Sequence, residues 1–113
     1  MSLTSGIELL TLDLNVMRGR ERSWLKTMSY AKLSLAVKQE ENLNPSQANY
    51  QVWRCAANSS PYLLLATIPG SQLQNNALVY IDKYFPLENS FSYYILAVDA
   101  SGNTVGTSEI GSI

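Results

Sequence analysis

Residues 80–103, YIDKYFPLENSFSYYILAVDASGN, decide the fold class of this chain. The segment begins with a turn and a six-residue corner, and residues 91–99 then alternate in side-chain character. Alternation of period two places four side chains on one face of a β-strand, namely Phe91, Tyr93, Ile95 and Ala97. The Ala-Ser-Gly-Asn sequence that follows is typical of a turn. The segment therefore predicts a half-buried strand between two turns, and it contains no signature of a chemical reaction.

Similar patterns predict six further strands. The full set covers residues 10–16, 31–38, 50–55, 62–68, 78–81, 91–99 and 105–110. Turn-forming residues separate these runs, and Pro69-Gly70 ends the fourth strand because Pro cannot donate to a ladder and Gly permits positive φ. Short strands with frequent turns favour an all-β, antiparallel β-sandwich of two sheets over a parallel α/β sheet.

Residues 17–30 have no clear pattern. They are basic at first and then aromatic and apolar, with Trp24, Leu25, Met28 and Tyr30. A helical turn, an additional strand and a long loop all remain open for this segment.

The decisive segment also resembles the fibronectin type III family in its bacterial form. AVDASGN at 97–103 is similar to the family's Ala-Val-Asp-Ala-x-Gly-Asn run. Asp82, Phe85 and Phe91 fall at its Asp, its corner Leu and its corner aromatic. Upstream, LSL at 33–35, YQVWR at 50–54 and PYLLLA at 61–66 resemble the family's second, third and fourth strands. The resemblance covers about residues 31–113 and implies an immunoglobulin-like sandwich.

The chain departs from the family at three places. Leu35 stands where the family has a central Trp, and Phe91 stands where it has a Tyr whose hydroxyl bonds back to the corner. Residues 6–30 are longer than a usual first strand.

The sandwich that this resemblance implies has a definite arrangement. One sheet should hold the first, second and fifth strands, and the other should hold the third, fourth, sixth and seventh. The expected core comprises Leu12, Leu14, Leu33, Leu35, Tyr50, Val52, Phe85, Phe91, Tyr93, Ile95 and Ala97.

Length and composition fit one independently folding domain. The chain has 113 residues, of which 1–3 could be a cloning remnant and 4–113 the domain, with an atypical segment at about 17–30. Cys55 is the single cysteine, so an intrachain disulfide is impossible, and we expect its thiol to be at least partly accessible. No apolar run approaches the roughly 18 residues of a membrane span. The net charge of −1 gives no reason to expect a nucleic acid partner.

The inventory of reactive side chains predicts a protein that is not an enzyme. The chain has no His, which excludes Cys-His and Ser-His-Asp arrangements within it. One Cys cannot form a structural zinc site. Asp82 and Asp99 could ligate a calcium ion with Asn103, but Asp at a strand end usually caps a turn. We therefore expect no catalytic residue, no cofactor and no metal.

One candidate binding face does follow from the strand periodicity. The core should be faced by Tyr50, Val52 and the buried side of residues 91–99. Because side chains alternate along a strand, the opposite, outward face should then carry Trp53, Tyr94, Leu96 and Val98. The third and sixth strands are neighbours in the family, so these four should form one contiguous patch. Such a patch either docks a partner or is covered by residues 17–30 folding back over it.

Two functions are compatible with this sequence. The resemblance implies a non-catalytic interaction or spacer module of a larger bacterial or phage surface protein, which would dock a neighbouring domain or another copy of itself. The alternative is a carbohydrate-binding accessory domain whose aromatic rings stack on sugars. Location outside the cell, or on a cell or virion surface, rests on the resemblance alone.

Overall fold

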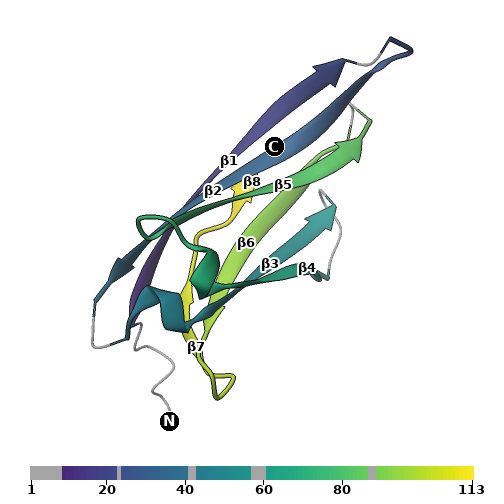
Figure 1. Cartoon of the computed structure of the whole chain (residues 1–113). Coiled ribbons are helices and arrows are strands. Elements are labelled where there is room, and N and C mark those ends of the chain that lie inside the picture. Colours follow the sequence, from purple (N-terminus) through teal and green to yellow (C-terminus); the bar gives the residue numbers. More distant parts are fainter. Residues whose placement is uncertain (1–8, 23, 41–42, 57–60, 87–88) are drawn as a thin grey trace.

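The chain folds into two antiparallel β-sheets packed as a sandwich (Figure 1). The computed structural model describes residues 9–22, 24–40, 43–56, 61–86 and 89–113, and these contain no α-helix. The three-stranded sheet has the order β1-β2-β5, with β1 (Leu10–Arg22), β2 (Thr27–Gln39) and β5 (Ala77–Phe85). The five-stranded sheet has the order β4-β3-β6-β7, with β3 (Asn49–Ala56), β4 (Leu63–Pro69), β6 (Phe91–Val98) and β7 (Thr104–Thr107). Its fifth strand, β8 (Gly111–Ser112), pairs with β6.

The predicted division of the strands between the two sheets is confirmed. The first, second and fifth strands share one sheet, and the third, fourth, sixth and seventh share the other. The short strand β8 was not predicted, because two residues carry too little pattern to be recognised. The cloning remnant proposed for residues 1–3 lies outside the described residues.

The first two strands extend well beyond their predicted ends at residues 16 and 31. Each has 13 residues, and their pairing continues from Leu10 opposite Gln39 to Arg22 opposite Thr27. The open segment 17–30 therefore forms the far half of one long hairpin, which Figure 1 shows reaching past the end of β5. The hydropathy pattern could not reveal this extension, because most of this half of the hairpin extends beyond the hydrophobic core.

Strand β5 is also longer than predicted, and the corner is correspondingly shorter. Residues 82–85, beyond the end of the strand predicted over 78–81, belong to β5 and not to the corner. Asn75 and Asn76 lead into this strand with φ values of 53° and 60°, as in the tight turns that bring two strands together. This turn was not predicted from the sequence, although Asn adopts positive φ more readily than most residues.

The end of the chain also differs from the prediction of one strand over 105–110. Strand β7 stops at Thr107 because the side chain of the buried Ser108 takes part in the ladder. Its Oγ accepts the Ile95 backbone N–H at 2.8 Å, and its own backbone N–H donates to the Ile95 carbonyl at 2.9 Å. The chain then rejoins β6 through β8.

The core lies between the sheets and matches the expected set closely. Nine of the eleven predicted residues are buried: Leu12, Leu33, Leu35, Tyr50, Val52, Phe85, Tyr93, Ile95 and Ala97. Leu14 and Phe91 are only partly buried and pack against the others. Tyr50 and Tyr93 are the largest fully buried side chains of this core.

Both buried tyrosines direct their hydroxyl groups to hydrogen-bond acceptors. Tyr50 donates to the Pro45 carbonyl at 2.7 Å, which anchors the 3-10 turn η2 (Pro45–Gln47). Tyr93 donates to Asp82 Oδ2 at 2.6 Å, and Arg54 Nη1 donates to the same oxygen at 2.9 Å. Because Asp82 belongs to β5 while Arg54 and Tyr93 belong to β3 and β6, this triad joins the two sheets.

Buried tyrosines predict a loss of stability at high pH. Burial raises the pKa of Tyr50 from 10.0 to about 12. Burial, reinforced by the hydrogen bond to Asp82, also raises the pKa of Tyr93. Above the unfolded pKa of about 10, the unfolded chain loses protons that the native chain keeps, so stability falls steadily until the folded pKa is passed.

We expect a single alkaline transition in which phenolate absorbance from these tyrosines rises together with loss of the far-ultraviolet β signal. Tyr50→Phe removes one of the hydroxyl groups whose pKa differs between the folded and unfolded states. The stability of this variant should therefore fall less steeply as the pH rises. Full ionisation of every tyrosine near pH 10 with the fold intact would contradict this expectation.

Candidate functional site

Three aromatic side chains gather on the outer face of the five-stranded sheet. Trp53 of β3 lies opposite Tyr94 of β6, and their rings are nearly parallel, with centroids 6.2 Å apart and planes at 6°. Tyr62, just before β4, packs its edge against Tyr94 at a centroid distance of 4.8 Å. Trp53 also donates its indole Nε1–H to Gln51 Oε1 at 3.2 Å, which fixes the orientation of the indole. We call Tyr62, Tyr94 and Trp53 the aromatic strip.

Aliphatic side chains border this strip. Leu96 and Val98 continue along β6, opposite Gln51 and Asn49 of β3. Leu64 of β4 pairs with Trp53 from the other side. The four residues predicted from sequence, Trp53, Tyr94, Leu96 and Val98, are all half-buried and lie on two adjacent strands. Together with Tyr62 and Leu64 they form what we call the charge-free face.

Sequence reasoning missed Tyr62 and Leu64. The register between β3 and β4 shifts between Val52 and Trp53, where β4 contains one extra residue. Such a bulge reverses the parity of the following residues, so simple alternation could not show which leucine of β4 lies beside Trp53.

The distribution of charge separates the two sheets. Strands β3, β4, β6, β7 and β8 contain one charged residue, Arg54, and its guanidinium is paired with the inward-facing Asp82. The three-stranded sheet contains nine charged residues: Asp13, Arg18, Arg20, Glu21, Arg22, Lys32, Lys38, Asp82 and Lys83. The outer face of the three-stranded sheet is therefore charged and hydrophilic. The outer face of the five-stranded sheet has no charged side chain among its strands.

The hairpin does not cover this face. The alternative in which residues 17–30 fold back over Trp53 and Tyr94 is wrong for the described residues, because β1 and β2 continue the other sheet. Trp24 is 94% exposed and Leu25 is 78% exposed at the end of the hairpin.

Cys55 lies at the edge of the charge-free face. It is half-buried near the end of β3, opposite Ser92, so its thiol is partly accessible as predicted. Burial and then the neighbouring Cys55 thiol raise the pKa of the Tyr62 hydroxyl. The chain's one thiol is therefore placed as a natural attachment point for a probe of this surface.

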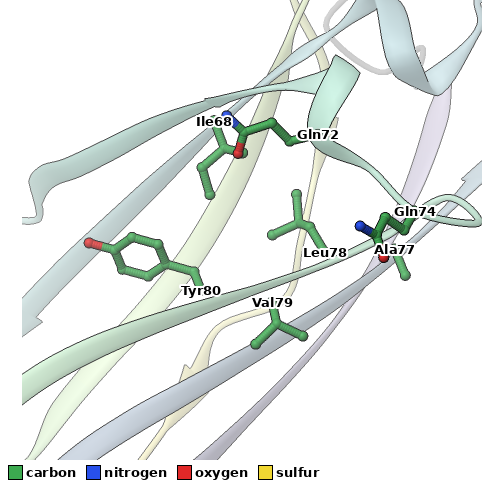
Figure 2. A pocket seen from close by; sticks show the side chains of 7 residues that line it. All are labelled: Ile68, Gln72, Gln74, Ala77, Leu78, Val79 and Tyr80. Atoms are coloured by element: carbon green, nitrogen blue, oxygen red, sulfur yellow. The ribbon is translucent and has the colours of Figure 1, made fainter.

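A separate groove lies where β5 forms the edge of the three-stranded sheet. It has a volume of about 590 Å³ and is lined by Ile68, Gln72, Gln74, Ala77, Leu78, Val79 and Tyr80. Figure 2 shows Leu78 and Tyr80 on the side of β5 that faces Ile68, with Val79 on the other side. Tyr80 is the one titratable side chain in this lining, and burial followed by the charge of Asp82 raises its pKa. The groove offers apolar and amide contacts and no acid–base pair.

The two aspartates considered as calcium ligands have structural partners. Asp82 accepts from Arg54 and Tyr93, as described above. Asp99 Oδ1 accepts the backbone N–H groups of Ser101 and Asn103, each at 2.9 Å, and so caps the turn after β6. Within the described ranges, no three Cys, Asp or Glu side chains lie close enough together to hold a metal ion. The same ranges contain no helix with the length and apolar character needed to cross a membrane.

The side chains on this surface are aromatic rings, aliphatic groups and the amides of Asn49 and Gln51. Comparison of the chain with protein-family models, with curated proteins and with solved structures gives no match.

Proposed function

We propose that this chain is a non-catalytic interaction module that docks protein through the charge-free face. The partner is a neighbouring domain of a larger bacterial or phage surface protein, or a second copy of the chain. The observation that supports this proposal is the uneven charge of the two sheets: the strands that carry Trp53 and Tyr94 contain one charged residue, Arg54, which pairs with the inward-facing Asp82.

The composition of the face fits the centre of a protein interface. Such centres are depleted in charged residues and enriched in Tyr and Trp, and a few large aromatic residues carry most of the binding energy. Trp53 is held by Gln51 and stacked on Tyr94, so little rotamer entropy remains to be lost when a partner binds. A soluble monomer seldom leaves such a surface open without a use.

The proposal extends to the kind of module. The sheet orders β1-β2-β5 and β4-β3-β6-β7 are compatible with the fibronectin type III resemblance of residues 31–113. That resemblance favours a spacer or docking role on a cell or virion surface. Fold analogy alone is a weak argument for function, and the charge-free face adds an argument from this chain itself.

The double variant Trp53→Ser, Tyr94→Ser tests this proposal by sedimentation velocity over a range of concentrations. We expect the wild type to self-associate as concentration rises and the variant to stay monomeric. The variant should lose about 0.2–1 kcal/mol of stability, the usual range for one cross-strand pair. The matched control is Val79→Ser, Ile81→Ser, which removes two exposed apolar side chains from the other sheet and should associate like the wild type.

A second readout uses the single thiol. A polarity-sensitive dye on Cys55 should shift to the blue as the wild type associates and should not shift in the double variant. If the double variant unfolds, the patch belongs to the core, and the docking proposal falls. A wild type that stays monomeric at all concentrations would exclude the second copy as partner.

The geometry also supports one alternative, a carbohydrate-binding accessory domain. Aromatic rings beside the Gln51 amide offer stacking and hydrogen bonding to a sugar. A glycan array separates the two functions, because a hit that the double variant loses would replace protein docking with sugar binding.

A further inference from the structure

The end of the β1–β2 hairpin carries the most exposed aromatic residue of the described chain. Trp24 is 94% exposed and the adjacent Leu25 is 78% exposed. Exposure of this extent leaves both side chains largely in water, and neither belongs to the charge-free face. Two large apolar side chains together at the far end of a projecting element contribute little to the core, and their exposure to water is unfavourable.

Three exposed basic residues lie close in sequence to this apolar end. Arg20, Arg22 and Lys26 are all exposed there, with Glu21 as the one acid among them. Residues 17–32 contain five basic residues and this single acid, although the whole chain has a net charge of −1. The hairpin is therefore positive and the remainder of the chain is negative, a separation that orients the molecule hairpin-first in the field of an anionic surface.

The hairpin is also placed to reach a surface ahead of the rest of the molecule. Towards the end of the hairpin, the last residue of β2 that pairs with β5 is Ser29, opposite Phe85, so residues 21–22 and 27–28 pair only with each other. The molecule measures 51 × 30 × 19 Å, and Figure 1 shows the hairpin projecting beyond β5 and β6. Its end can meet a planar surface without a clash from either sheet.

We infer that the end of the β1–β2 hairpin binds the surface of an anionic lipid bilayer. Trp24 and Leu25 enter the interfacial region, where Trp is favoured because its ring is apolar and its N–H stays hydrated. Arg20, Arg22 and Lys26 contact lipid phosphates. This is attachment to one leaflet by a hairpin end, and it involves no membrane span.

Lipid fits these observations better than nucleic acid or protein. Single-stranded nucleic acids are bound along grooves in which aromatic rings and cations track the backbone, whereas here they meet at one projecting point. Contact with a nucleobase would bury little of the apolar Leu25 side chain, whereas transfer of this side chain into hydrocarbon is directly favourable. The narrow hairpin end also lacks the area of a standard protein interface, about 800 Å² on each partner.

The inference is tested with the full chain and two kinds of vesicle, one of phosphatidylcholine and one with equal parts of phosphatidylglycerol. Binding is measured by co-sedimentation. In a Trp53→Phe background, Trp24 is the only tryptophan, so its fluorescence reports its own environment. We expect binding to the anionic vesicles with a blue shift of Trp24, weakening as salt is added, and little binding to the neutral vesicles.

Two variants separate the apolar and the electrostatic contributions. Arg20→Gln, Arg22→Gln, Lys26→Gln should lower the partition coefficient on the order of 100-fold, about fivefold for each charge near the surface. Trp24→Ser, Leu25→Ser should lower it on the order of 10-fold through lost apolar burial. The matched control Lys32→Gln, Lys38→Gln, Lys83→Gln makes the same change in net charge on the same sheet. It should lower binding far less, because the attraction falls off within about 10 Å.

Several results would overturn the inference. The hairpin end would have no specific role if the chain bound both kinds of vesicle equally. The same would follow if the basic triple variant and its control lost equal amounts of vesicle binding. Adsorption without a blue shift would mean that Trp24 does not enter the membrane. Tight binding of an oligonucleotide with no binding to vesicles would assign the same residues to nucleic acid. The two hairpin variants and the control should fold normally, since the side chains that they replace are exposed, and Trp53→Phe keeps an aromatic ring at its half-buried position.

Discussion

Asp82→Ala should destabilise the fold by about 2–4 kcal/mol, because it removes the acceptor that two partners from the other sheet share. Breaking a buried ion pair by deleting one partner commonly costs about 3–5 kcal/mol. The expected loss here is smaller, since the Arg54 side chain keeps 30% of its surface exposed and can be partly hydrated, while that of Asp82 is 11% exposed. The buried Tyr93 hydroxyl, however, loses its acceptor. Urea denaturation with linear extrapolation measures the difference.

The matched control for this substitution is Asp99→Ala. Asp99 also accepts two hydrogen bonds, but it does so in an exposed turn, where water can replace the carboxylate. Its removal should cost about 1 kcal/mol. Equal costs for the two variants would mean that the triad of Arg54, Asp82 and Tyr93 contributes no more than an ordinary turn cap.

Gly70→Ala should destabilise the fold by about 3 kcal/mol, at the upper end of the range for overpacking. A Cβ at this position would lie 2.3 Å from the Ala48 carbonyl oxygen and 2.7 Å from those of Pro45 and Ser46. All three are backbone atoms, so no side-chain rotation can relieve the clash. Moving the η2 turn away would also disturb the hydrogen bond from Tyr50 to Pro45.

Gly102→Ala serves as the comparison, because the two glycines are present for different reasons. Gly102 has a φ of +87° and open space where a Cβ would lie, so alanine there meets only backbone strain, about 1–2 kcal/mol. The expectation that Gly70 serves by permitting positive φ is wrong: Gly70 is not among the residues with positive φ and is required by close backbone approach. A smaller loss for Gly70→Ala than for Gly102→Ala would contradict this assignment.

The central strands could be predicted because one face of each is buried. Tyr50 and Val52 in β3, and Tyr93, Ile95 and Ala97 in β6, show period two in hydropathy, and all five are in the core. The same alternation placed Trp53 and Tyr94 outward, and the register between β3 and β6 brings them together without a bulge. Where burial differs between the two faces of a strand, the sequence contains the information needed.

The far half of the hairpin could not be predicted for the opposite reason. Beyond Val16, the alternating positions of β1 are taken by arginines: Arg18 lies over the ring of the buried Phe85, and Arg20 and Arg22 are exposed. Period two is still present there, but in charge and not in hydropathy. Trp24 and Leu25 suggested a buried segment because large apolar residues normally are buried, and here they lie at the exposed end.

Phe91 shows a limit of prediction by family position. It was expected in the core as the corner aromatic, and it is only partly buried. The Arg54 guanidinium lies over its ring, 4.4 Å from the centroid, and the rings of Phe91 and Phe85 pack edge to face with their centroids 4.9 Å apart. A cation stacked on its outer side takes the place of further apolar packing. Such a cross-strand contact depends on register, which the residues of β6 alone do not determine.

The extension of the hairpin beyond β5 also implies that different parts of this protein open at different rates. Amide hydrogens of β3 and β6 lie in a ladder with strands on both sides, so their exchange with solvent requires opening of much of the sandwich. Amides at Arg22, Thr27 and Met28 belong to a two-stranded ribbon, which is marginally stable by itself. They should exchange by local fraying while the sandwich remains intact. The end of the hairpin can therefore change shape on contact with a surface, at a free-energy cost that is not drawn from the stability of the domain.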